Sequence, residues 1–292
     1  MKIFERYLHG TGEEQPLPAT RAKAFFYYGR EYFGRLVLSS LTGSLFFLPA
    51  LIWLYVMHYA EAKTISAPDA TAPDYAEVLL ALQKRFALTT YGVLIPLLAL
   101  FFVGLAGCFS LAKRISMGES AGFSEFWRGI RQNGWRYFLF GAVSGSVCLV
   151  VRMNLLAYRG RPGFLSGLLV FCAALLFIVT VLILLYCMTQ TVIYCVGVGQ
   201  LLKNAVLLSF GRFFKNVGMF LLPALPAIAV LLIPSPFQLI GLAILAIFYP
   251  GFGALYAVHC CLSVYDTTIN PMLGEEYVGR GLAKKTNKTP EL

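Results

Sequence analysis

The sequence predicts an all-α polytopic membrane protein, with about six transmembrane helices arranged as three hairpins and both termini in the cytoplasm. Six apolar runs, most of them reaching the roughly 20 residues that cross a bilayer, are separated by polar segments. Hydrophobic residues make up 58% of the chain and charged residues 13%, whereas soluble domains carry about 25% charged residues. Basic residues are concentrated in alternate segments. Together these observations exclude an ordinary soluble domain.

The apolar runs are the predicted spans. They cover residues 36–59, 86–111, 137–156, 163–194, 217–233 and 237–264. The fifth run has only 17 residues and depends on its flanks to cross the bilayer. The uncharged stretch 163–202 is predicted to be one long helix, because two spans within it would break the charge alternation. That helix is expected to end near Gly197-Val-Gly199, where the chain bends onto the inner surface.

Lys and Arg residues predict the orientation of the chain. Eighteen of the 24 lie in the N-terminal segment, the second and fourth loops and the tail. Positive residues stay cytoplasmic, so both termini are predicted to be inside. Topology and attraction to the anionic inner leaflet explain the net charge of +10 without nucleic acid as a partner. The predicted organisation is a cytoplasmic segment 1–35 with an interfacial helix, a transmembrane domain 36–264 and a cytoplasmic tail 265–292.

Three predicted inner segments, residues 21–36, 123–134 and 206–217, combine an aromatic face with basic residues, as amphipathic interfacial helices do. Two of them align without a gap at an offset of 84 residues: Phe126-x-Arg128-x-x-Arg131-x-x-Gly134 and Phe210-x-Arg212-x-x-Lys215-x-x-Gly218. The alignment agrees with three repeated units, each an inner helix followed by a hairpin. The alternative is that any inner interface needs basic and aromatic residues.

The most prominent candidates for contact on the predicted inner face are Trp127, Arg128, Arg131, Arg212 and Lys215. Two interpretations stay open for them. The basic residues anchor to anionic lipid, or they form a docking surface in which arginine binds a partner carboxylate through its planar, two-pronged guanidinium.

Polar residues in spans would be the default functional candidates. Arg152, near the outer end of the third span, is expected to reach the headgroups. Gln190 is interpreted as a polar contact between helices. Asp266, at the inner end of the last span, is expected to pair with a basic residue of an inner loop. No Asp or Glu lies within a predicted span, which argues against a proton-coupled pump.

The glycine-rich sequences are predicted to be structural. Gly141-x-x-x-Gly145 and Gly104-x-x-Gly107 are typical of closely packed helices, here within one chain. Gly274-x-x-x-x-Gly279-Arg280-Gly281 resembles a phosphate-binding loop, but Arg280 replaces the lysine and no strand precedes it. The seven cysteines lie in or beside apolar runs and are interpreted as small buried hydrophobes. We therefore expect no catalytic residue, metal or cofactor.

Short motifs along the chain resemble a known family. They are Pro16-x-Pro18 before Arg21-Ala-Lys-Ala-Phe-Phe, Tyr32-Phe33-Gly-Arg35-Leu36 entering a span that ends near Leu48-Pro49, Gly118-Glu119 before Phe126-Trp127-Arg128-Gly129-Ile-Arg131-Gln-Asn133, and Leu202-Lys203-Asn204-Ala205 with Phe214-Lys215-Asn216. This set resembles the YesL-like bacterial membrane proteins, a domain of unknown function commonly associated with carbohydrate ABC importers. The resemblance implies a bacterial cell-membrane location and an accessory role in sugar uptake, and it supplies no catalytic residues.

The sequence thus leads to two functional hypotheses. The first is a non-catalytic accessory or assembly partner of an oligosaccharide ABC import system. The alternative is a small-solute transporter or channel in its own right, because many transporters are built from repeats. The sequence does not indicate an oligomeric state.

Overall fold

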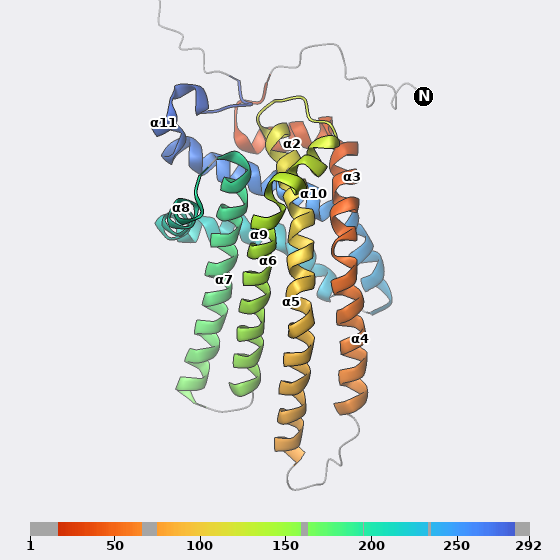
Figure 1. Ribbon diagram of the computed structural model, residues 1–292. Helices are drawn as coiled ribbons and strands as arrows, with labels where there is room; N and C mark the ends of the chain where they lie inside the picture. The colour runs from red at the N-terminus through yellow and green to blue at the C-terminus, as the bar shows by residue number, and fades with distance from the viewer. Residues whose placement is uncertain (1–16, 66–74, 159–162, 195, 233–234, 284–292) are drawn as a thin grey trace, which may run out of the picture. The chain divides into compact units, whose positions relative to one another are not determined.

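The computed structural model describes residues 17–65, 75–158, 163–194, 196–232 and 235–283, and these residues form helices joined by short connections (Figure 1). The helices are α2 (Arg21–Glu31), α3 (Phe33–Leu45), α4 (Leu48–Ile65), α5 (Tyr75–Ser116), α6 (Ser124–Tyr158), α7 (Phe164–Ile193), α8 (Val198–Gly211), α9 (Phe213–Leu232), α10 (Ser235–Thr268) and α11 (Asn270–Leu273), followed by the 3-10 turn η1 (Glu275–Tyr277). Within this described part, four helices are long and apolar enough to cross a membrane, or up to six if each bent pair is one span. The predicted class, a polytopic helical membrane protein, is confirmed.

Two of the predicted spans are bent pairs of helices. The first consists of α3 and α4, whose axes differ by 46°. Pro49 is the second residue of α4. A proline is tolerated in the first turn of a helix, but in a continuous helix it lacks the backbone N–H and clashes with the carbonyl four residues earlier, which explains a break just before it. The fifth consists of two parts of α9, Phe213–Phe220 and Ala224–Val230, which differ by 49°.

The predicted inner helices differ from one another in the structure. The segment 21–36 contains a separate helix, α2, that ends before Tyr32. The segment 123–134 is not a separate helix, because α6 runs from Ser124 through the third predicted span. The segment 206–217 is interrupted at Arg212, between α8 and α9. The two aligned segments therefore have different backbone structures, and their similarity does not extend beyond the residue pattern.

The stretch 163–202 contains one long helix and a break, as predicted. The helix, α7, ends at Ile193, slightly before the expected Gly197. The chain enters α8 at Val198, after Gly197 as the N-cap residue. Figure 1 shows α8 nearly end-on while α7 runs along the plane of the picture, so α8 lies across α7.

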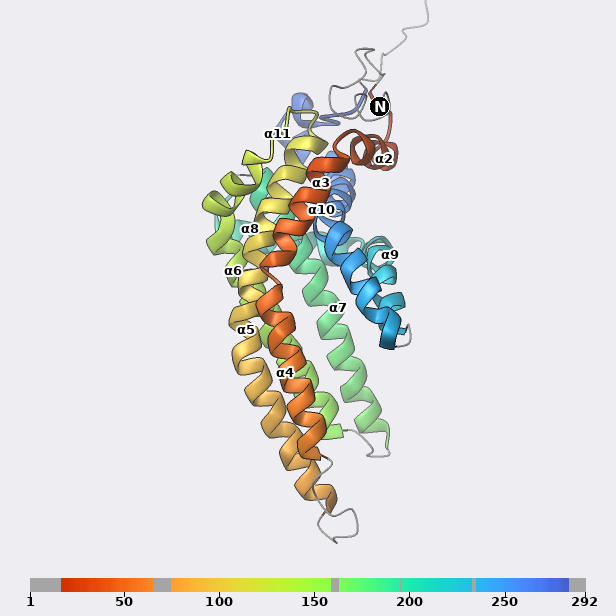
Figure 2. The ribbon, with the colours of Figure 1, turned by 90° about the vertical axis from the view of Figure 1, so that its right-hand side faces the viewer.

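The chain divides into two compact units. Unit 1 comprises Met1–Leu41, Gly107–Gly129 and Pro223–Leu292, and unit 2 comprises Thr42–Ala106 and Ile130–Leu222. In unit 2, helix α4 and the adjoining parts of α5, α6 and α7 run side by side (Figures 1 and 2). The Trp53 indole donates to the Thr90 carbonyl over 2.9 Å, which joins α4 to α5. The Tyr137 hydroxyl donates to the Met188 carbonyl over 2.7 Å, which joins α6 to α7.

The glycine motifs allow close helix packing within one chain, as predicted. A Cβ atom at Gly141 would lie 2.6 Å from the Cα atom of Ala99, and one at Gly145 would lie 3.1 Å from Ile95. Small residues let two backbones approach in this way. The motif in α6 therefore packs against α5 of the same unit.

Unit 1 is organised around α10. A Cβ atom at Gly251 would lie 2.4 Å from the Leu36 carbonyl oxygen, so the first part of α3 packs directly on α10. The Ser40 hydroxyl accepts from the Gly251 amide over 2.8 Å. Helix α2 also packs on α10, where the rings of Phe25 and Tyr256 meet edge to face with centroids 5.6 Å apart. These contacts place the first residue of α2 near the end of α10.

Candidate functional site

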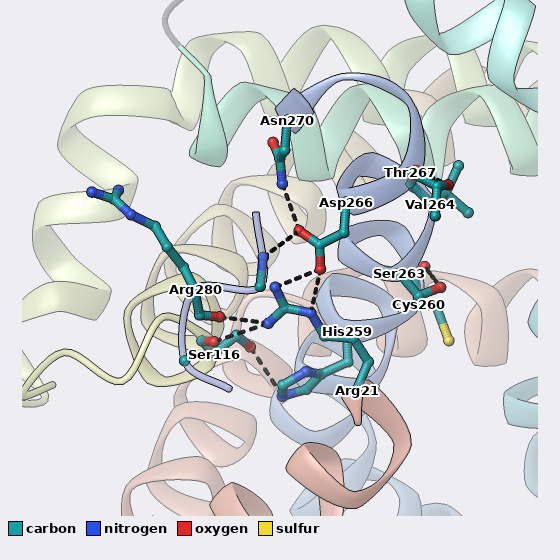
Figure 3. A network of polar contacts seen from close by, with 12 residues as sticks. Arg21, Ser116, His259, Cys260, Ser263, Val264, Asp266, Thr267, Asn270 and Arg280 are labelled. Atoms are coloured by element: carbon teal, nitrogen blue, oxygen red, sulfur yellow. Dashed lines mark hydrogen bonds and ion pairs between the residues drawn. The ribbon is translucent and has the colours of Figure 1, made fainter. Parts of the chain in front are cut away.

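A cluster of buried polar residues joins four segments of unit 1 (Figure 3). We call it the Arg21 cluster, and its members are Arg21 and Tyr28 of α2, Ser116 of α5, His259 and Asp266 of α10, and the turn 279–281. Arg21 is the first residue of α2, and the preceding Thr20 side chain accepts from the Lys23 amide over 3.3 Å. This N-cap fixes where the helix begins. The start of the helix in turn directs Arg21 towards α10.

The Arg21 guanidinium contacts three groups. Its Nε atom donates to Asp266 Oδ2 over 2.9 Å, and a terminal nitrogen lies 2.8 Å from the same oxygen. The other terminal nitrogen donates to the Arg280 carbonyl over 2.7 Å and to the Ser116 carbonyl over 3.5 Å. The Ser116 carbonyl belongs to the last turn of α5, where carbonyls have no partner within the helix.

The Asp266 carboxylate is also bonded through its second oxygen. Asp266 Oδ1 accepts from the Asn270 side-chain amide over 2.7 Å and from the Gly279 backbone amide over 3.1 Å. Arg21 and Asp266 are 8% and 14% exposed, so both charges lie largely out of water. Removing one partner of a buried pair typically costs about 3–5 kcal/mol, because the remaining charge is left uncompensated. Asp266 pairs with a basic residue, Arg21, but this partner belongs to helix α2 of the N-terminal segment and not to an inner loop as predicted.

The glycines of the C-terminal turn shape this cluster. Gly279 and Gly281 have φ values of +67° and +75°, a region that residues with a Cβ atom rarely adopt. A Cβ atom at Gly281 would lie 2.3 Å from the Ser116 carbonyl oxygen. The Tyr28 hydroxyl donates to the Gly281 carbonyl over 2.9 Å, and burial raises the pKa of Tyr28 to about 12. The glycine-rich run therefore forms a turn that closes on α2 and α5.

Ser116 and His259 form a second polar contact inside the cluster. The Ser116 hydroxyl lies 3.2 Å from Nε2 of His259, and the His259 ring stacks on Tyr28 with centroids 6.1 Å apart. A serine beside a histidine is part of a hydrolytic triad. Here both side chains are buried, and the Asp266 carboxylate bonds to Arg21, Asn270 and Gly279. The contact is therefore interpreted as structural.

A chain of ion pairs lies in the segment 113–128 of unit 1, which we call the Arg114 loop. Arg114 is 2.9 Å from Glu119 and 3.3 Å from Glu125. Glu125 is 3.6 Å from Arg128. Two of the three basic residues in this segment thus have acidic partners. Exposed pairs of this kind add little stability, but they hold the side chains in defined positions.

The Arg114 loop places two of the predicted contact residues together. Trp127 and Arg128 are both exposed, and Arg128 is oriented by Glu125. Phe126 is fully buried, where its ring fills the space that Gly107 leaves open: a Cβ atom at Gly107 would lie 2.5 Å from the Phe126 ring. The other three predicted residues, Arg131, Arg212 and Lys215, belong to unit 2.

Arg212 and Lys215 lie in a segment of unit 2, residues 198–216, that we call the α8–α9 corner. Asn216 holds the corner together. Its side-chain amide donates to the Leu208 and Ser209 carbonyls over 2.8 and 3.2 Å, and its oxygen accepts from the Tyr186 hydroxyl over 2.8 Å. Among the described residues, no acidic group forms an ion pair with Arg212 or Lys215.

The two remaining polar candidates differ from their predicted environments. Arg152 was expected to reach the headgroups, without an acidic partner in the protein. In the structure it lies 3.8 Å from Glu61 of α4. Gln190 is fully buried, but its amide has no hydrogen-bond partner in the part of the chain that the structure covers. The predicted polar contact between helices is therefore not found at Gln190.

Sequence reasoning missed the role of Arg21, Ser116 and His259. Two signals were present. His259 and Asp266 are seven residues apart in α10, two helical turns, and so share one face. Gly279 and Gly281 flank an arginine in a polar segment, which is typical of a tight turn. Among the described residues, no group of three or more His, Cys, Asp or Glu side chains could hold a metal ion.

The fold and the polar clusters define a polytopic helical membrane protein whose charged side chains are concentrated near helix ends. No protein-family model, curated protein or solved structure matches this chain. The resemblance to YesL-like proteins stays a prediction.

Proposed function

We propose that this protein is a non-catalytic membrane protein that docks a partner protein through the Arg114 loop, as an accessory or assembly subunit of a carbohydrate ABC import system. The choice of an importer as the partner rests on the resemblance of the sequence motifs to YesL-like proteins. The observation that carries the docking role is the ion-pair chain from Glu119 through Arg114 and Glu125 to Arg128.

The ion-pair chain favours a protein partner over simple lipid attraction. Attraction to an anionic membrane depends on uncompensated positive charge. In the Arg114 loop, acidic partners oppose the charges of Arg114 and Arg128. A patterned surface of both signs, with the exposed Trp127 beside it, fits a partner with complementary charges. Arg and Trp are also enriched at the centres of protein interfaces.

The test is a charge-preserving substitution. Arg128→Lys keeps the positive charge but loses the planar fork that binds a carboxylate. We expect normal insertion and abundance, with loss of the co-purifying importer subunit in mild detergent and impaired sugar-dependent growth. Arg212→Lys at the α8–α9 corner is the matched control and should keep both. Retained complex and growth in Arg128→Lys would reject an arginine-mediated dock at this loop.

The proposed topology is tested independently. Cysteines introduced at Asp69 or Asp74, which lie outside the described residues, should react with a membrane-impermeant thiol reagent in intact cells. Cysteines at Glu119 or Glu275 should not react. Labelling of Glu275→Cys from outside would show that the tail is extracellular.

A further inference from the structure

The α8–α9 corner has three distinct faces. One face packs on the protein: Leu201, Ala205 and Ser209 recur every four residues and are buried. The neighbouring edge is apolar and open, with Val198, Leu202, Val206 and Phe210 at the same spacing. Lys203, Gln200 and Asn204 lie on the other edge together with the exposed Leu207, and Gln200 donates to Asn204 over 3.1 Å. A helix that presents exposed apolar side chains beside a basic residue and amides is suited to the boundary between acyl chains and water.

The orientation of α8 agrees with this boundary. Helix α7 is a candidate span, and α8 lies across it (Figure 1). A helix that crosses an upright span runs parallel to the membrane plane. Phe214, just beyond the break at Arg212, is 89% exposed, and an exposed Phe ring on an interfacial segment fits the acyl-chain boundary.

The charge of the corner is uncompensated. Lys203, Arg212 and Lys215 lie within it, and no Asp or Glu occurs between Glu125 and Asp266 in the whole sequence. Lys203 and Lys215 are exposed and Arg212 is partly exposed. Each basic side chain can therefore keep its full attraction for a negative surface, unlike those in the Arg114 loop.

We infer that the α8–α9 corner is a binding element for anionic phospholipid. Its apolar edge and Phe214 enter the acyl-chain boundary, while Lys203, Arg212 and Lys215 contact headgroup phosphates. No acidic residue lies between these three cations in the sequence, so no negative side chain of this segment repels the phosphates. This inference concerns a different surface from the proposed dock and does not depend on it.

The test uses the full-length protein in a neutral detergent, with phosphatidylglycerol or phosphatidylcholine added and the thermal midpoint measured. Phosphatidylglycerol should raise the midpoint of the wild type, and phosphatidylcholine should raise it much less. The variant Lys203→Gln/Arg212→Gln/Lys215→Gln should need on the order of 100-fold more phosphatidylglycerol for the same rise, since each basic residue contributes about five-fold in affinity. Its midpoint without lipid should match the wild type, because surface substitutions change stability little.

Arg128→Gln in the Arg114 loop is the matched control and should change the response far less than Lys215→Gln. Three outcomes would overturn the inference. The triple variant could keep the full response to phosphatidylglycerol. Inorganic phosphate at millimolar concentration could give the same rise, which would identify a soluble anion. The triple variant could keep the lipid response and lose a bound protein, which would identify a protein-docking surface instead.

Discussion

The Arg114 loop and the α8–α9 corner share one residue pattern but differ in how the structure holds it. In the loop, Phe126 is buried, and Arg128 lies 3.6 Å from Glu125. In the corner, the matching Phe210 is 56% exposed, and Arg212 has no acidic neighbour in the sequence around it. The difference teaches that basic and aromatic spacing alone does not determine the surroundings of these side chains. The acidic neighbours and the burial of the ring differ between the two regions, and the proposed protein dock and the inferred lipid site rest on that difference.

The largest expected effect comes from the Arg21 cluster, which belongs to unit 1 like the Arg114 loop. Asp266→Leu removes the carboxylate that bonds Arg21, Asn270 and the Gly279 amide. We expect a loss of about 3–5 kcal/mol, because the Arg21 charge is left buried without a negative counter-charge. Thermal unfolding in detergent measures it. Lys23→Gln, an exposed charge on α2, should leave the midpoint unchanged, and equal losses in both variants would contradict the buried pair.

A glycine comparison tests the turn that closes this cluster. Gly281→Ala combines a φ of +75° with a Cβ atom 2.3 Å from the Ser116 carbonyl. Gly279→Ala has a similar φ of +67°, but nothing lies within 4 Å of its Cβ atom. Left-handed backbone geometry alone costs about 1–2 kcal/mol, so both variants should lose stability and Gly281→Ala should lose clearly more. Equal midpoints for the two variants would show that Gly281 does not pack closely against the Ser116 carbonyl of α5.

Asn216 provides the corresponding test in the corner. Asn216→Ala removes the bonds to the Leu208 and Ser209 carbonyls and leaves the Tyr186 hydroxyl without its Asn216 partner. We expect a loss of about 1–3 kcal/mol, because buried groups lose their hydrogen bonds to Asn216. Asn204→Ala removes a bond on the exposed edge of α8 and should cost much less. The readouts are the thermal midpoint and the protease sensitivity of the corner, and an undisturbed Asn216→Ala protein would show that Asn216 does not hold the corner together.

The smallest expected effect on stability comes from a double substitution that gives the Arg114 loop the uncompensated charge of the α8–α9 corner. Glu119→Gln/Glu125→Gln leaves Arg114 and Arg128 without acidic partners, and exposed pairs contribute at most about 1 kcal/mol each to stability. The thermal midpoint in neutral lipid should therefore barely change. The rise in midpoint with phosphatidylglycerol should increase, because the loop now resembles the corner in its uncompensated charge. An unchanged lipid response would show that the acidic partners do not decide between the two kinds of surface.

Some features of the fold follow from local sequence. The membrane class follows from long apolar runs, because the preference of a segment for the bilayer is close to a sum over its residues. The close packing at Gly141 and Gly145 was also predictable from local sequence, because small residues at this spacing let two helix backbones approach. The end of α7 was predicted within a few residues, because Gly197 and Gly199 interrupt an otherwise uniform run.

Other features depended on contacts between distant residues. The sequence indicated that Asp266 needs a basic partner, because a carboxylate at the end of a span is costly when unpaired. It did not indicate Arg21, which is 245 residues away, because Arg21 reaches Asp266 only after α2 packs on α10. The same reason applies to the aligned segments. Residue spacing predicted two similar inner helices, whereas the space at Gly107 for the Phe126 ring and the break at Arg212 gave them opposite environments.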